Sequence, residues 1–88
     1  MILALFSFLL TANPAAVPEP LPPHLERQAR EIGSVMRCPV CQGMPIVDSP
    51  SDMARAMMTK TRTLLREGKS KQDVFDYFTS RYGQWVLL

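Results

Sequence analysis

Cys38 and Cys41 are the only two cysteines in this 88-residue chain, and they lie together in the stretch MRCPVCQGMPIVDS. Two cysteines separated by two residues can bind a metal, attach heme, form a structural disulfide or exchange disulfides with a partner. Each of these chemistries makes a different demand on the surrounding sequence. The neighbours of the pair therefore distinguish among them.

Zinc binding and heme attachment find little support in the rest of the chain. A structural zinc site takes four Cys or His ligands, and the only histidine, His24, is distant in the sequence. Zinc would therefore need ligands from a second chain. Covalent heme attachment uses C-x-x-C-H, but the residue after Cys41 is Gln42. We expect no metal-binding residue and no stably bound cofactor in this chain.

A structural disulfide is the remaining alternative to redox exchange. The stabilisation from a disulfide grows with the length of the loop that it closes, and here that loop is very short. In contrast, two intervening residues allow the second thiolate to resolve a mixed disulfide formed by the first. Pro39 restricts the loop, and Arg37 beside Cys38 favours its thiolate. The spacing favours a redox-active pair and leaves open which sulfur attacks first.

The stretch before the pair has the periodicity of an amphipathic helix. It begins at the prolines 22–23 and should end near Arg37, because Pro39 keeps Cys38 out of the helical region. Gly33 weakens this helix by about 1 kcal/mol relative to Ala.

Cys38 then follows a helix C-terminus, where the helix dipole disfavours an anion. A pair without thiolate stabilisation should be reducing rather than oxidising. The apolar positions of the helix are Leu25, Ala29, Ile32, Val35 and Met36.

Two further helices follow the pair. The segment 49–52 places a capping hydroxyl at Ser49, a proline at the first helical position and an acid two residues later. This second helix should end at Gly68. A similar capping pattern over residues 70–73 begins a third helix, which should end at Gly83. The fold class is therefore expected to be all-α, a small three-helix bundle with the CxxC motif in the long loop between helices 1 and 2. The apolar face of the second helix comprises Met53, Ala54, Met57, Met58, Thr61, Leu64 and Leu65.

The two ends of the chain differ from this central part in composition. Residues 1–16 begin with the uncharged run MILALFSFLL and are expected to be a signal peptide or an N-terminal anchor. Residues 17–23 contain four prolines and form a spacer, which leaves residues 24–88 as the folded domain. The C-terminal QWVLL could pack on the bundle or lead into a further segment, and Trp85 is expected to pack against the bundle. The net charge of +2 gives no argument for nucleic-acid binding.

Residues 25–88 resemble the N-terminal domain of the CcmH family of cytochrome c maturation proteins, also called CycL. The resemblance rests on MRCPVCQGMPIVDS together with the later blocks E-G-K-S, D-Y and R-Y-G-x-x-V-L. Two departures are Met36, where leucine is common, and the segment 43–45, which replaces a more polar run. Family members continue into a transmembrane helix, whereas this sequence ends at Leu88.

The resemblance implies a periplasmic, membrane-anchored thiol–disulfide oxidoreductase at the inner membrane of bacteria. Such proteins are expected to reduce or capture the C-x-x-C-H cysteines of apocytochrome c for heme ligation. Their partners would be a heme lyase membrane subunit and a thioredoxin-like periplasmic reductant, and heme would be handled with these partner proteins. Cys38 and Cys41 would be the catalytic pair with a redox-active disulfide. The positions carried over as supporting residues of the loop are Arg37, Pro39, Gln42, Asp48 and Ser49.

An alternative within the same resemblance is a subunit that presents apocytochrome c to a heme lyase complex without turnover. The related subunit that serves nitrite reductase has a similar pattern. Export would place Cys38 and Cys41 in an oxidising compartment, where a disulfide can persist.

Overall fold

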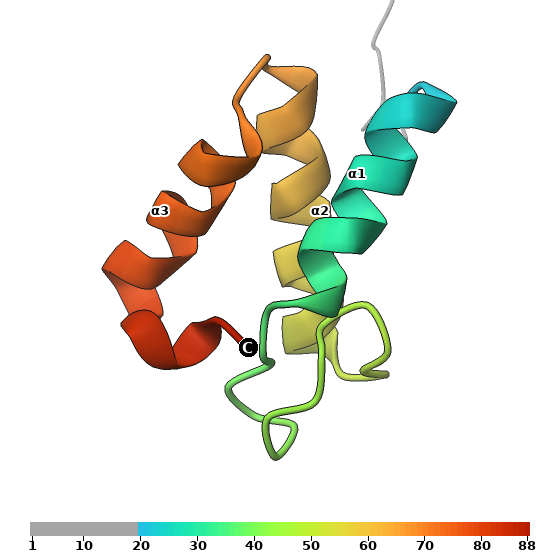
Figure 1. Ribbon diagram of the computed structural model, residues 1–88. Coiled ribbons are helices and arrows are strands. Elements are labelled where there is room, and N and C mark those ends of the chain that lie inside the picture. The colour runs from blue at the N-terminus through green and yellow to red at the C-terminus, as the bar shows by residue number, and fades with distance from the viewer. Residues whose placement is uncertain (1–19) are drawn as a thin grey trace, which may run out of the picture.

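The computed structural model describes residues 20–88 and folds them into an all-α bundle. Three helices, α1 (Pro23–Ser34), α2 (Asp52–Arg66) and α3 (Lys71–Tyr82), are followed by a 3₁₀ turn, η1 (Gln84–Val86). Figure 1 shows α2 between α1 and α3, with the α1–α2 loop at one end of the bundle. This confirms the predicted bundle with the CxxC motif in that loop. The predicted signal peptide, residues 1–16, lies outside the described residues.

The beginning of α2 differs from the sequence prediction. Ser51, not Ser49, is the N-cap, and its hydroxyl accepts a hydrogen bond of 3.1 Å from the Ala54 N–H. Asp52 then occupies the first turn, where the helix dipole stabilises a negative charge. The hydroxyl of Ser49 is engaged elsewhere, in a hydrogen bond to Cys41. Both hydroxyls contact the sulfur of Cys41, but only that of Ser51 also accepts a helix N–H.

The predicted boundaries of α3 are confirmed. Ser70 and Asp73 form a capping box, in which each side chain accepts a hydrogen bond from the backbone N–H of the other residue. Gly68 and Gly83 have φ values of 86° and 79°, which non-glycine residues rarely adopt. These glycines allow the chain to turn at the ends of α2 and α3.

Helix α1 ends at Ser34, three residues earlier than the sequence predicted. Met36 and Arg37 leave the helix to form isolated antiparallel bridges with Leu87 and Pro45. The Arg37 N–H donates to the carbonyl of Val86 at 2.7 Å. Pairing with the distant C-terminal tail thus overrides the local helical periodicity.

The core lies between the apolar faces of the helices, as their periodicity predicted. Gly33 brings α1 close to α2, because a Cβ at this position would lie 2.4 Å from the sulfur of Met58. No helix within residues 20–88 is long and apolar enough to cross a membrane. The buried apolar side chains of the three helices are Ala29, Ile32, Ala54, Met57, Met58, Leu64, Leu65, Val74 and Phe78.

The C-terminal tail turns back beside the loop that follows α1 (Figure 1). Val86 is buried, and the Leu88 N–H donates to the carbonyl of Val35 at 2.8 Å. Trp85 is 49% exposed and packs on the loop that follows α1, where it lies beside Arg37 and Gly43. The guanidinium of Arg37 lies over its ring, 5.5 Å from the ring centroid, and holds it at the edge of the loop.

Candidate redox site

The cysteines lie in a loop that is closed by its own backbone. The Cys38 N–H donates to the Met44 carbonyl at 2.8 Å, and the Met44 N–H donates to the Cys41 carbonyl at 3.1 Å. The chain reverses between them at Gln42 and Gly43, whose φ values are 55° and 77°. Gln42 is the only described non-glycine residue with a positive φ, so the turn beside Cys41 holds a backbone conformation that is uncommon for its residue type.

The two sulfurs are free thiols that lie 2.8 Å apart. A disulfide bond measures about 2.05 Å, so closing it requires only a small movement. Cys38 is completely buried, whereas Cys41 is partly exposed. Val40, which directly precedes Cys41, is 68% exposed. The pair therefore meets solvent on the side of Cys41.

Two serine hydroxyls surround the sulfur of Cys41. The Ser49 hydroxyl donates to the Cys41 sulfur at 2.7 Å, and the Cys41 thiol donates to the Ser51 hydroxyl at 2.8 Å. The Ser51 hydroxyl also lies 3.4 Å from the sulfur of Cys38. If Cys41 loses its proton, both hydroxyls can turn to donate to the resulting thiolate, because a hydroxyl both donates and accepts.

The position of the pair relative to the helices corrects the sequence prediction. Cys38 does not directly follow α1, which ends four residues earlier at Ser34. The sulfur of Cys41 instead contacts Ser51, the N-cap of α2. A helix N-terminus stabilises a thiolate, so the argument for a reducing couple based on the end of α1 no longer holds.

Burial and hydrogen bonding act in opposite directions on the Cys38 thiol. Burial raises its pKa, but the hydrogen bonds that link it to Cys41 and Ser51 outweigh this effect and lower the pKa below the ordinary value of 9.0. Because the two thiols are in contact, a proton leaves the pair rather than one independent residue. The hydrogen bonds around Cys38 therefore favour its thiolate form.

The expected supporting residues take different places around the pair. Ser49 is buried and bonds directly to Cys41, while Pro39 lies half-buried between the cysteines. Arg37 packs on Trp85 instead of reaching a sulfur, and its buried Nε has no hydrogen-bond partner among residues 20–88. Two of the expected residues are exposed, with side chains that form no hydrogen bond to another described residue: Gln42 and Asp48.

Ser51 is the site residue that the sequence prediction missed. Its signal was the alternation Ser49-Pro50-Ser51, in which either serine could cap the following helix. The Ser51 hydroxyl caps α2, whereas the Ser49 hydroxyl bonds to Cys41 and to Ser51. The choice between them depends on the fold of residues 38–44, which local pattern does not specify.

The whole chain, residues 1–88, matches the model of the CcmH family, described as a cytochrome c biogenesis protein. The chain belongs to the CcmH family. Similar proteins include cytochrome c-type biogenesis protein Ccl2 of Rhodobacter capsulatus, with 37% identity over 91 residues that cover 99% of this chain and 61% of the relative.

Two relatives from Escherichia coli strain K12 match a shorter part of the chain. Cytochrome c-type biogenesis protein CcmH is 43% identical over 61 residues, which cover 69% of this chain and 17% of the relative. The formate-dependent nitrite reductase complex subunit NrfF is 33% identical over 64 residues, which cover 73% of this chain and 50% of the relative. This CcmH-family chain thus spans less than two thirds of the length of each of these three relatives.

Proposed function

We propose that this chain is a thiol–disulfide oxidoreductase of cytochrome c maturation, which reduces or captures the C-x-x-C-H cysteines of apocytochrome c for heme ligation. The main support is the arrangement of two free thiols 2.8 Å apart, one partly exposed and one buried, at the N-terminus of α2. Membership of the CcmH family supplies the biological setting. The site would face the periplasm at the bacterial inner membrane, beside a heme lyase membrane subunit.

Cys41 is the sulfur that attacks first in this proposal. It is the more exposed of the two, and two hydroxyls and the Cys38 thiol lie within 2.8 Å of its sulfur. The Cys41 thiolate attacks one sulfur of a disulfide in the C-x-x-C-H segment. A mixed disulfide forms, the substrate disulfide breaks, and the other substrate cysteine leaves as a thiolate that takes up a proton.

Cys38 then resolves the mixed disulfide. Its sulfur is already next to Cys41, and its lowered pKa favours the thiolate that this step requires. It attacks the sulfur of Cys41, and the bond between Cys41 and the substrate breaks. The second substrate cysteine is released as a thiol. The substrate disulfide has then been reduced, and Cys38 and Cys41 have been oxidised to a disulfide. A thioredoxin-like dithiol returns the two electrons and the protons, which restores the reduced pair.

Separate replacement of the cysteines tests this order. We expect Cys38→Ser to accumulate a mixed disulfide through Cys41 when it is mixed with an oxidised C-x-x-C-H peptide. Cys41→Ser should accumulate much less, because the remaining sulfur is buried. Non-reducing electrophoresis and intact mass measure the adduct. If neither variant forms an adduct and both still support cytochrome c maturation, the proposed exchange is wrong.

A presenting subunit without turnover is a second candidate, in which capture through one sulfur matters more than reduction. The similarity to a subunit of a nitrite reductase complex favours it, since that relative is named for its complex and not for an oxidoreductase activity. Repeated reduction of an oxidised peptide in the presence of excess dithiol reductant separates the two candidates. Many turnovers per chain support the oxidoreductase, whereas a single stoichiometric adduct supports presentation.

A further inference from the structure

The short segment that carries Cys38, residues 36–38, is hydrogen-bonded on both of its sides. On one side the Arg37 N–H donates to the Val86 carbonyl of the C-terminal tail at 2.7 Å. On the other side the Cys38 N–H donates to the Met44 carbonyl at 2.8 Å. This segment therefore lies between the tail and the chain that leaves the redox site, and each of these neighbours forms an isolated antiparallel bridge with it.

The side chains of this segment alternate between two sides, as in a strand. Met36 and Cys38 point into the core and are completely buried. Arg37, between them, points to the other side and stacks on the ring of Trp85, with its guanidinium 5.5 Å from the ring centroid. Within residues 20–88 the Arg37 side chain forms no hydrogen bond or ion pair. Contact with the Trp85 ring is therefore what holds this guanidinium.

The ring of Trp85 also reaches the chain that leaves the redox site. A Cβ on Gly43 would lie 3.8 Å from the Cδ of Arg37 and 4.0 Å from the Cζ2 of Trp85, which are ordinary van der Waals distances. Arg37 directly precedes Cys38, and Gly43 is the second residue after Cys41. One side chain of the C-terminal tail thus packs on the two chain segments that enter and leave the cysteine pair.

We propose that Trp85 is a positioning residue for the Cys38–Cys41 pair. Its ring packs on both flanking segments, through Arg37 and Gly43, and so keeps the two sulfurs at the short separation of 2.8 Å. This inference rests on the proposed disulfide exchange and adds the contact that makes its second step fast.

The separation of the sulfurs matters most for the second step of the exchange. In that step Cys38 attacks the sulfur of Cys41 and the substrate leaves as a thiolate, so the rate depends on how well two groups of one loop are held together. The first step, attack by Cys41 on the substrate disulfide, needs only the partly exposed sulfur. Loss of the ring should therefore slow the second step and leave the first unchanged.

The equilibrium with glutathione tests this positioning without apocytochrome c. Glutathione disulfide oxidises the reduced pair to the Cys38–Cys41 disulfide and is itself reduced to two glutathione thiols. In Trp85→Ala, the equilibrium constant for this reaction should be about two- to fivefold smaller than in the wild type, the factor that corresponds to a partly exposed cation–π contact. Alkylation of the remaining thiols and intact mass of the full chain measure this constant. An unchanged constant would overturn the proposal.

A kinetic comparison assigns the effect to the second step. The probe is an oxidised Cys-Ala-Ala-Cys-His peptide, and the lifetime of its mixed disulfide is measured by acid quenching and intact mass. Trp85→Ala should lengthen this lifetime by about two- to fivefold. In Cys38→Ser, where only the first step occurs, adding Trp85→Ala should leave the rate of adduct formation unchanged. Equal changes in the two steps would contradict a role in positioning the pair.

Two further variants test the route from the ring to the pair. Trp85→Phe keeps an aromatic face for Arg37, so its equilibrium constant should lie closer to that of the wild type than to that of Trp85→Ala. Arg37→Ala removes the guanidinium that the ring holds. In the double variant Arg37→Ala, Trp85→Ala, the total change should be smaller than the product of the two single changes, because the side chains act through each other. Independent effects would contradict this route.

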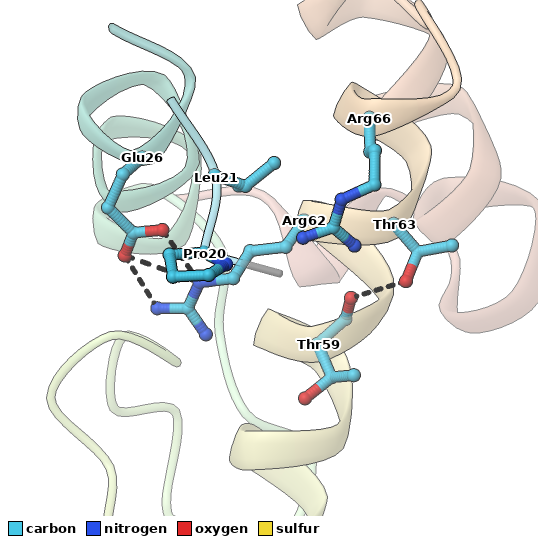
Figure 2. Close-up of a pocket in the computed structure, with 7 residues that line it drawn as sticks. All are labelled: Pro20, Leu21, Glu26, Thr59, Arg62, Thr63 and Arg66. Atoms are coloured by element: carbon cyan, nitrogen blue, oxygen red, sulfur yellow. Dashed lines mark hydrogen bonds and ion pairs between the residues drawn. The ribbon is translucent and has the colours of Figure 1, made fainter. Parts of the chain in front are cut away.

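A variant far from the redox loop is the control for a general loss of stability. Figure 2 shows Glu26 of α1 facing Arg62 of α2, and the two side chains form a bidentate pair with distances of 2.9 and 3.0 Å. Glu26 lies in the first turn of α1, at the opposite end of that helix from the redox loop. Glu26→Gln should therefore leave the equilibrium with glutathione unchanged. A change as large as that in Trp85→Ala would overturn the proposal.

The outcomes separate this inference from the proposed function. If Trp85→Ala shifts the equilibrium with glutathione but neither chain forms a mixed disulfide with the C-x-x-C-H peptide, the proposed function is wrong and the positioning of the pair by Trp85 is supported. If the peptide is reduced and Trp85→Ala changes neither the equilibrium nor the lifetime of the mixed disulfide, the positioning role is wrong and the proposed function is supported.

Discussion

The hydroxyl that caps α2, that of Ser51, lies 2.8 Å from the sulfur of Cys41. The same oxygen accepts the Ala54 N–H at 3.1 Å. One side chain therefore completes the first turn of a helix and contacts the exposed thiol. Because the two roles depend on different properties of the side chain, substitutions can separate them.

Replacing Ser51 by Ala should affect both the stability and the reactivity of the protein. Loss of an N-cap destabilises a helix by about 1 kcal/mol, which lowers the melting temperature of a domain of this size by roughly 4–8 °C. The Ser51 hydrogen bond also helps to lower the pKa of Cys38. Because the two thiols titrate as a pair, the pH profile for alkylation of the pair by iodoacetamide should move to higher pH.

Two matched variants show whether these effects are separate. Ser51→Thr keeps a hydroxyl and should change both properties little. Ser51→Asp keeps a good helix cap but places a carboxylate beside the sulfurs, which disfavours a thiolate. It should melt near the wild-type temperature and still shift the alkylation profile to higher pH. A wild-type profile in Ser51→Asp would contradict the assigned contact.

Ser49→Ala should change reactivity without changing the cap of α2. The Ser49 hydroxyl donates to the Cys41 sulfur at 2.7 Å and makes the smallest of the contributions that lower the pKa of Cys38. We expect a smaller upward shift of the alkylation profile than in Ser51→Ala, with an unchanged helical circular dichroism signal. Ser34→Ala, at an exposed serine of α1, is the control. A larger shift in Ser49→Ala than in Ser51→Ala would reverse this ranking.

Local sequence signals were sufficient for the helices themselves. The capping box of Ser70 and Asp73 involves residues three positions apart, and Gly68 and Gly83 each provide a positive φ at their own position. The spacing of Cys38 and Cys41 likewise placed both in one loop. These features depend on neighbours in the sequence, and they were predicted correctly.

Contacts between distant residues determined the features that were missed. The end of α1 depends on the pairing of Met36 with Leu87, which lies 51 positions later in the sequence. Ser49 and Ser51 both contact Cys41, which lies eight and ten positions earlier in the sequence, and only Ser51 caps α2. The contact between Cys41 and the N-cap of α2 likewise depends on how the α1–α2 loop folds. None of these contacts leaves a periodic pattern in the sequence.

Gly33→Ala should destabilise the protein although alanine is the better helix former. The substitution gains about 1 kcal/mol of intrinsic helix propensity. However, the new Cβ would lie 2.4 Å from the Met58 sulfur and 3.2 Å from the Val47 Cβ. Overpacking of this kind costs about 1–3 kcal/mol, and we expect a net loss of about 1 kcal/mol.

Urea unfolding of Gly33→Ala measures the balance between propensity and packing. Gln28→Ala, at a partly exposed position of the same helix, is the control for a substitution to alanine. If Gly33→Ala were more stable than the wild type, Gly33 would not be needed for the close approach of α1 and α2.

Glu26→Gln should reduce stability near neutral pH but not in acid. The hydrogen bond from Arg62 lowers the pKa of Glu26 below 4.5, against the opposing effect of burial. The folded state therefore binds the Glu26 proton more weakly than the unfolded chain does. The Glu26–Arg62 pair thus stabilises the fold above pH 4.5, and this contribution disappears as the pH falls through the lowered pKa of Glu26.

The size of this effect is limited by solvent, because the side chains of Arg62 and Glu26 are 34% and 35% exposed. We expect Glu26→Gln to lose about 0.5–1 kcal/mol at pH 7, as measured by urea unfolding, and to match the wild type at a pH well below 4.5. Glu31→Gln, at an exposed position of α1, should show no such dependence on pH. A difference between wild type and Glu26→Gln that grows on acidification would have the wrong sign for a carboxylate with a lowered pKa.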